Sequence, residues 1–184
     1  VQVAGTAGVP AGATAVTLNV TVTGTSAASF LTVWPTGTPR PTASNLNWAA
    51  GQTIANAVTV KVGAGGSVSV FNPSGSAQVI VDVVGWYDRS GSGAGYSAVS
   101  PVRVLDSRPP PEQVGAYGSP WGPGTDRDVQ VAGVGGVPAD AEAVVANVTV
   151  TGTTAESFLA VYPDGASRPT GSSLNWGGGT TIPN

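Results

Sequence analysis

The side chains that could carry out chemistry in this chain are mainly its carboxylates, because it contains no histidine and no cysteine. The absence of histidine removes the commonest general base and the Ser-His and Cys-His nucleophile pairs. A pair of carboxylates could hydrolyse a glycosidic bond, but most of the 10 acidic residues fall in turns or in a linker-like segment. Only Asp82 and Asp106 fall in predicted strands. The sequence therefore predicts a protein that is not an enzyme and has no cofactor.

Asp82 has the most unusual setting of the acidic residues. It lies in the segment 79–86, whose two faces are both apolar, and this pattern predicts a central strand. A carboxylate in such a strand costs several kcal/mol unless it is paired or hydrogen-bonded. We expect Arg103 to be the partner in a structural ion pair that joins two strands. The alternative is a perturbed active-site carboxylate.

Large aromatic rings beside amide side chains are the second chemical feature. A flat ring suits the face of a sugar, and an amide suits its hydroxyl groups. The triplet Leu-Asn-Trp occurs twice, at 46–48 and 174–176. The alternative is that the tryptophans cap the ends of a sandwich and that Asn47 holds its own turn. The candidate ligand-binding residues are Trp34, Asn47, Trp48, Tyr162, Asn175 and Trp176.

These candidates occur in two sets because the chain repeats itself. Residues 1–56 align without a gap with residues 129–184, and 37 of these 56 positions are identical, which gives a period of 128 residues. A gapless repeat of this kind indicates a segment of a tandem array, or a protein built to behave like one. We expect the second copy to lack the strands that follow residue 56 in the first copy, and therefore to have open strand edges.

Apolar and polar residues alternate through most of the chain, which predicts strands rather than helices. In 16–23 the row Thr17, Asn19, Thr21 and Thr23 is expected to face water while the other side faces a core. Short strands at this spacing predict an all-β, antiparallel β-sandwich of jelly-roll-like type with a partial second copy; a barrel is the alternative. The other predicted strands are 30–34, 45–48, 57–62, 67–71, 78–86, 101–108, 146–151 and 158–162.

The glycine- and serine-rich stretch 89–95 predicts a linker. It separates 1–88, a β-sandwich module without its N-terminal Arg-Val-Leu-Asp-Ser-Arg strand, from 96–184, a second module without its C-terminal strands. Alternatively, residues 1–128 close on themselves as one permuted domain. Residues 129–184 would then offer unpaired edges to a neighbouring copy, by strand exchange in head-to-tail order.

The composition argues against several classes of partner. Charged residues make up 9% of the chain, the net charge is -3 and the seven basic residues are scattered, so we expect no nucleic-acid binding. No apolar run approaches the roughly 20 residues that cross a bilayer, so membrane insertion is not expected. Asp126 and Asp128 are spaced as calcium ligands could be, but their neighbours do not supply enough oxygens, and no metal is predicted.

Several segments together resemble a known type of module. VIVDVVGWYD at 79–88, VSPVRVLDSR at 99–108 and SSLNWGGGTTIPN at 172–184 are similar to elements of a β-rich repeat module in secreted and surface proteins of actinobacteria. That module is appended to secreted enzymes or stands in tandem. The resemblance implies an extracellular accessory module without established catalytic activity. Relative to the module's order of elements, this chain is permuted.

These observations predict a non-catalytic, secreted or cell-surface repeat module for attachment or recognition, with a carbohydrate or cell-wall polymer as its partner. The alternative is a structural spacer or a self-assembling module that associates through residues 129–184.

Overall fold

The computed structural model describes residues 1–91 and 93–184. Contacts group the chain into two compact units, one formed by Val1–Gly91 with Asn147–Asn184 and the other by Ser92–Ala146. These two units do not follow the boundaries between the two copies of the repeat. The modules 1–88 and 96–184, and the closure of 1–128, therefore remain predictions.

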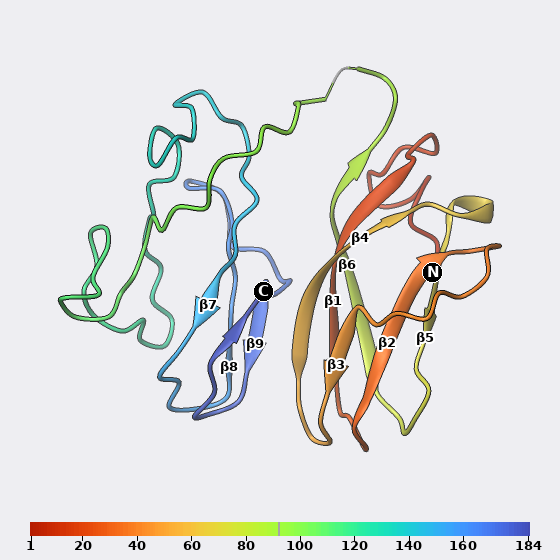
Figure 1. Ribbon diagram of the computed structural model, residues 1–184, viewed down its shortest axis with the longest axis horizontal. Helices are drawn as coiled ribbons and strands as arrows, with labels where there is room; N and C mark the ends of the chain where they lie inside the picture. The colour runs from red at the N-terminus through yellow and green to blue at the C-terminus, as the bar shows by residue number, and fades with distance from the viewer. Residues whose placement is uncertain (92) are drawn as a thin grey trace. The chain divides into compact units, whose positions relative to one another are not determined.

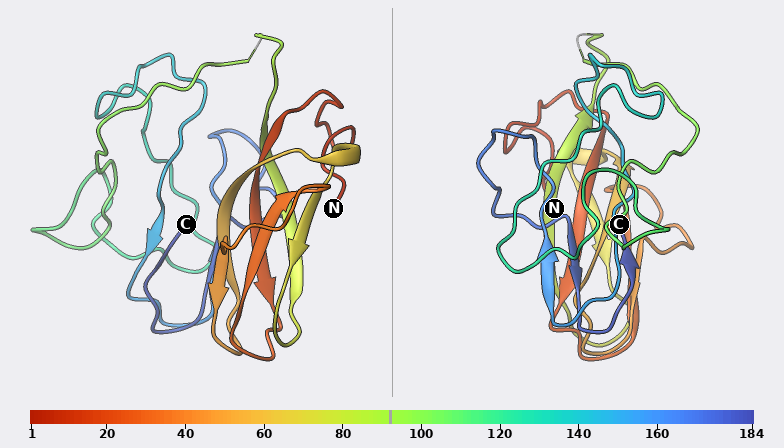
Figure 2. Two further views of the ribbon diagram at one scale, coloured as in Figure 1. Left: turned by 45° about the vertical axis from the view of Figure 1, so that its right-hand side comes forward. Right: turned by 90° about the vertical axis from the view of Figure 1, so that its left-hand side faces the viewer.

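The protein is all-β and antiparallel, as predicted, and the first copy of the repeat forms two three-stranded sheets (Figure 1). The further views show the two sheets face to face as a sandwich (Figure 2). The described strands form no closed barrel. One sheet has the order β4-β1-β6, with β4 at Ile54–Lys61, β1 at Ala15–Thr23 and β6 at Gln78–Tyr87. The other has the order β3-β2-β5, with β3 at Leu46–Trp48, β2 at Ser29–Pro35 and β5 at Val68–Phe71.

The second copy forms shorter strands in the same register. Ser29 pairs with Trp48 in the first copy, and Ser157 pairs with Trp176 in the second. The strands predicted at 146–151 and 158–162 are both shorter in the structure. The two-stranded sheets join β7 (Thr149–Val150) to β10 (Ile182–Pro183) and β8 (Ser157–Leu159) to β9 (Leu174–Trp176). A 3-10 turn, η1 (Ala64–Gly66), is the helix in the described part of the chain, and it is too short to span a bilayer.

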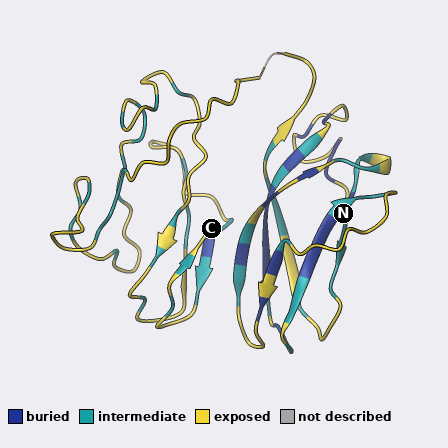
Figure 3. Ribbon diagram, viewed as in Figure 1, coloured by how far each residue is buried: buried dark blue, intermediate teal, exposed yellow. Residues whose placement is uncertain are grey.

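The core of the first copy lies between the two sheets, and β1 is its central strand. Because side chains alternate along a strand, Val16, Leu18, Val20 and Val22 all point inward, and all four are fully buried. The facing sheet contributes Leu31, Val33 and Val68 to the same cluster. Figure 3 shows buried residues in β1, β2 and β4, whereas β6 is intermediate to exposed. Burying each such side chain stabilises the fold by about 1.5–3 kcal/mol.

β6 is an edge strand, which corrects the central position predicted from its composition. The sheet order ends at β6, and its side chains are partly open on both faces, with Val84 65% exposed. A β-bulge at Val84 also changes which face of the sheet the following side chains of β6 point to. Leu18 pairs with Val83, whereas Thr17 pairs with Gly85. Asp82, opposite Asn19, therefore lies on the face turned away from the core.

Residues 93–146 are irregular in structure. The strand predicted at 101–108 is reduced to an isolated bridge between Asp106 and Val114. An aromatic and arginine cluster organises the following loop: the rings of Tyr117 and Trp121 meet edge to face at 5.6 Å, and Arg127 lies 4.4 Å from the centre of the Trp121 ring. The Arg127 guanidinium also donates to the carbonyl oxygens of Ser119 and Pro120.

Candidate functional site

Trp48, a candidate from the Leu-Asn-Trp triplet, lies in the core. Its side chain is in the buried cluster at 6% exposure, and its Nε1 donates to the carbonyl oxygen of Ala27 at 3.0 Å. The face of this ring is therefore not open to a ligand. The Trp48 ring therefore contributes to the packing of the first copy, and the capping of the sandwich ends by the tryptophans stays a prediction.

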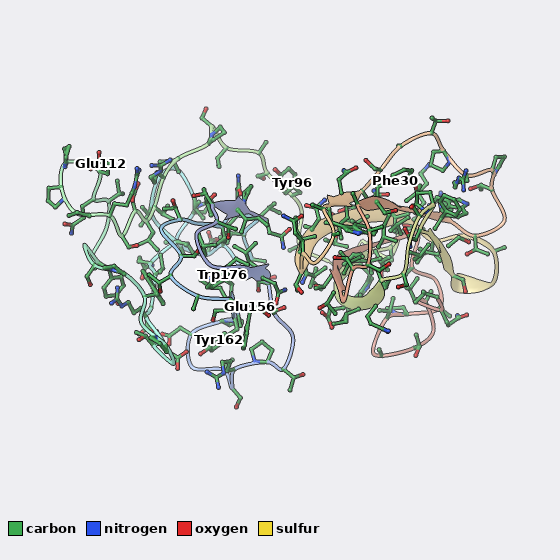
Figure 4. The ribbon with its side chains drawn as sticks, turned by 90° about the horizontal axis from the view of Figure 1, so that it is seen from below. Phe30, Tyr96, Glu112, Glu156, Tyr162 and Trp176 are labelled. Carbon is green, nitrogen blue, oxygen red and sulfur yellow. The ribbon has the colours of Figure 1, made fainter. Side chains whose placement is uncertain are left out.

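The other aromatic candidates are half-buried. Trp34 donates from Nε1 to the carbonyl oxygen of Thr38 at 3.1 Å, which fixes its ring under the loop that follows β2. In the second copy, the side chains of Tyr162 and Trp176, labelled in Figure 4, are also half-buried. Trp176 is thus more accessible than its repeat equivalent Trp48.

The strand register reveals an aromatic and amide pair that the sequence analysis missed. Phe30 lies directly opposite Asn47, and Phe158 lies directly opposite Asn175. Directly opposite side chains on a sheet are close enough to act together. Asn47 is exposed and Phe158 is 55% exposed. The Phe at the second position of each Ser-Phe-Leu strand was visible in the repeat, but its partner could be assigned only once the register was known.

Asn19 is the centre of a second candidate surface, on the outer face of β1. It was expected to face water with Thr21, but the two side chains are only 5% and 4% exposed. Segments of the second copy cover Asn19. Asn19 Nδ2 donates to the carbonyl oxygen of Ser172 at 2.5 Å, and Asn19 Oδ1 accepts from Asn184 Nδ2 at 3.0 Å.

Asn184 completes this contact with further bonds. Its Oδ1 accepts from the backbone N–H of Ala57 in β4 at 2.7 Å, and its Nδ2 also donates to the carbonyl oxygen of Ser173. The repeat equivalent Asn56 donates from Nδ2 to the carbonyl oxygen of Asn45, the equivalent of Ser173. The asparagine at this position therefore donates to the same backbone carbonyl within its own copy in both cases. In the second copy it also bonds to residues of the first copy.

Apolar packing accompanies these hydrogen bonds. Leu174 in β9 is fully buried and lies against β4. Gly171 approaches β6 closely, because a Cβ at this position would lie 3.6 Å from the carboxylate of Asp82. We call the surface formed by Asn19, Ala57, Ser172, Leu174 and Asn184 the inter-copy contact.

The arginine of the predicted Asp82 pair has another carboxylate as its neighbour. Arg103 Nη1 lies 2.7 Å from Asp106 Oδ2, and Arg108 binds the same carboxylate through Nε and Nη2. Hydrogen bonds and the charge of Arg108, together with the hydrogen bond from Arg103, hold the pKa of Asp106 well below its usual value of 3.8. Asp82 and Arg103 belong to different units, and their ion pair remains a prediction.

Comparisons with known proteins give no further assignment: no family model, no curated protein and no solved structure matches this chain. Within 1–91 and 93–184, no group of three or more acidic, histidine or cysteine side chains is arranged to hold a metal ion.

Proposed function

We propose that this chain is a non-catalytic structural repeat module whose copies dock on one another. The observation that carries the proposal is the buried amide of Asn19, whose Nδ2 and Oδ1 are both bonded by the second copy. A buried amide with both ends satisfied fixes one orientation of its partner, because any other leaves polar groups unpaired. The resemblance to actinobacterial modules supports a location outside the cell as part of this proposal.

Substitution of Asn19 tests the docking of the two copies. Asn19→Ala removes two hydrogen bonds from a buried contact and should lower the free energy of unfolding by about 1–3 kcal/mol. It should also speed amide hydrogen exchange at residues 172–184, which lose their anchor. Asn47→Ala, at an exposed asparagine of β3, is the matched control. Unchanged exchange at 172–184 in Asn19→Ala would contradict the proposal.

Carbohydrate or cell-wall recognition is the second candidate, and the repeated phenylalanine and asparagine pairs favour it. Phe158 offers an exposed ring opposite an amide, the combination that suits a sugar. Pull-down on insoluble glycans and cell-wall polymer tests this function. Phe158→Ala and Trp176→Ala should lose retention if these rings bind, whereas Tyr96→Ala, which removes a 76% exposed ring elsewhere, should not. Equal retention of all the variants would argue against it.

A further inference from the structure

The free edge of β6 borders an open groove. The groove has a volume of about 390 Å³ and lies between Val81, Asp82 and Val83 of β6 and the segment 1–7. That segment is tied to β5, since the N–H of Val68 donates to the carbonyl oxygen of Val1 at 2.9 Å. The segment 1–7 therefore covers the β5 edge of the β3-β2-β5 sheet. In the β4-β1-β6 sheet, β6 is the last strand and has a free edge. An unpaired edge of this kind can accept another strand.

The side chains along this edge define what strand would fit. Val81 and Val83 are half-buried and pack against the core, so they favour apolar partners. Asp82 lies between them on the opposite face and favours a basic partner. Ile80, on the face of Asp82, is 49% exposed and favours an apolar partner beside it. The groove thus selects an extended segment in which apolar residues flank an arginine or lysine.

The segment 101–106 of this chain has that pattern. If Arg103 lies opposite Asp82 in an antiparallel pair, Val102 and Val104 fall opposite Val83 and Val81. Leu105 then falls opposite Ile80. Pro101, which has no N–H to donate, falls opposite the bulge residue Val84, where the pairing of β6 with β1 shifts its register.

We propose that the segment 101–106 of a second copy of this chain adds to β6 as an antiparallel strand, with Arg103 paired to Asp82. Arg103 is available, because its side chain is 61% exposed and Asp106 keeps both bonds to Arg108 when Arg103 leaves. Two chains can exchange these strands reciprocally and close as a symmetric dimer. The inference extends the proposed structural role to a second surface and does not need the inter-copy contact.

Charge reversal in the chain of residues 1–184 tests the pairing. Sedimentation velocity over a concentration series should show a monomer–dimer equilibrium for the wild type. Asp82→Arg and Arg103→Glu should each weaken dimerisation at least about tenfold, because like charges then face each other. An equimolar mixture of the two variants should dimerise again, since each edge then meets a strand of opposite charge. Asp140→Arg and Arg168→Glu make the same charge changes at exposed positions and should leave dimerisation unchanged.

Two results would overturn the proposal: a wild-type chain that stays monomeric throughout the series, or single variants that dimerise as the wild type does. If the charge reversal disturbs folding, which circular dichroism would show, Asp82→Asn replaces it. Asp82→Asn should weaken dimerisation, and its mixture with Arg103→Glu should recover only partly, because only one of the two exchanged edges then pairs Asp82 with Arg103. Amide exchange at 172–184 reports separately on the inter-copy contact. Because Gly171 lies close to the Asp82 carboxylate, the two surfaces are separated with Arg103→Glu, whose substitution lies outside the inter-copy contact: weaker dimerisation with unchanged exchange at 172–184 assigns the effect to β6.

Discussion

Asp106 shows what two arginines do to one carboxylate. Its side chain is 8% exposed, and Arg103 and Arg108 both bind Oδ2 at 2.7 Å. The bonds are stronger to the ionised form, so the folded protein holds the charge at a pH where the unfolded chain would be protonated. Asp106 holds two arginines of the irregular segment 93–146, and it therefore also makes the stability of that segment depend on pH.

Acid should weaken this contribution. The pKa of Asp106 is lowered in the folded state, so its stabilisation is fully present above about pH 4 and is lost as the pH falls further. Denaturant unfolding followed by tryptophan fluorescence should show a stability gap between the wild type and Asp106→Asn at neutral pH that narrows below about pH 4. Asp140→Asn is the exposed control, and a gap that does not change with pH would contradict this assignment.

The arginine neighbours of Asp106 were visible in the sequence because they lie within three residues of it. The burial of Asn19 was not, because an alternating strand gives the same pattern whether its polar face meets water or another segment. The groups that cover Asn19 lie more than 150 residues away in the chain. Sequence periodicity carries no information on such a contact.

At the scale of elements, the prediction of where strands lie in the sequence was confirmed, but the prediction that β6 lies at the centre of its sheet was wrong. The strands of the first copy appear where alternation predicts them, with ends shifted by a few residues. The apolar pattern of β6 predicted a central strand, but a bulge at Val84 and an edge position give it partly open faces instead. A single extra residue reverses the faces of everything after it, and composition does not reveal that residue.

The link between the two sheets should be sensitive to side-chain size at Gly63. A Cβ at this position would overlap the backbone of Pro35 and Thr36. Gly63→Ala should therefore lower the free energy of unfolding by about 1–3 kcal/mol, because the strand ends must move apart. Gly85→Ala, where nothing lies within 4 Å of the new Cβ, should change it by less than about 0.5 kcal/mol. Equal effects in urea unfolding would contradict the close approach.

At the scale of the whole molecule, regular structure and burial are unevenly distributed. The buried cluster belongs to the first copy of the repeat, whereas in 93–146 the described residues make one isolated bridge and no strand. Regions with few buried contacts open with little free energy. The two units are therefore expected to differ in local stability.

Native-state hydrogen exchange should resolve this difference. Amides of β1, β2 and β4 should exchange slowest, because they open only with global unfolding, and amides of 93–146 should exchange faster at the same pH and temperature. Residues 172–184 should lie between these limits through their anchor on Asn19. Uniform protection over the whole chain would contradict the unequal distribution of buried contacts.

The inter-copy contact joins unlike surfaces of two like copies: the outer face of β1 in the first, and residues 172–184 in the second. Such a contact defines one rotation and one translation between neighbours. Were further copies to dock in the same proposed way, repeating this operation would generate a screw axis, and each added copy would extend the assembly by a constant step. The amide of one asparagine would thus help to set the pitch of a filament and the reach of whatever such an array carries at its end.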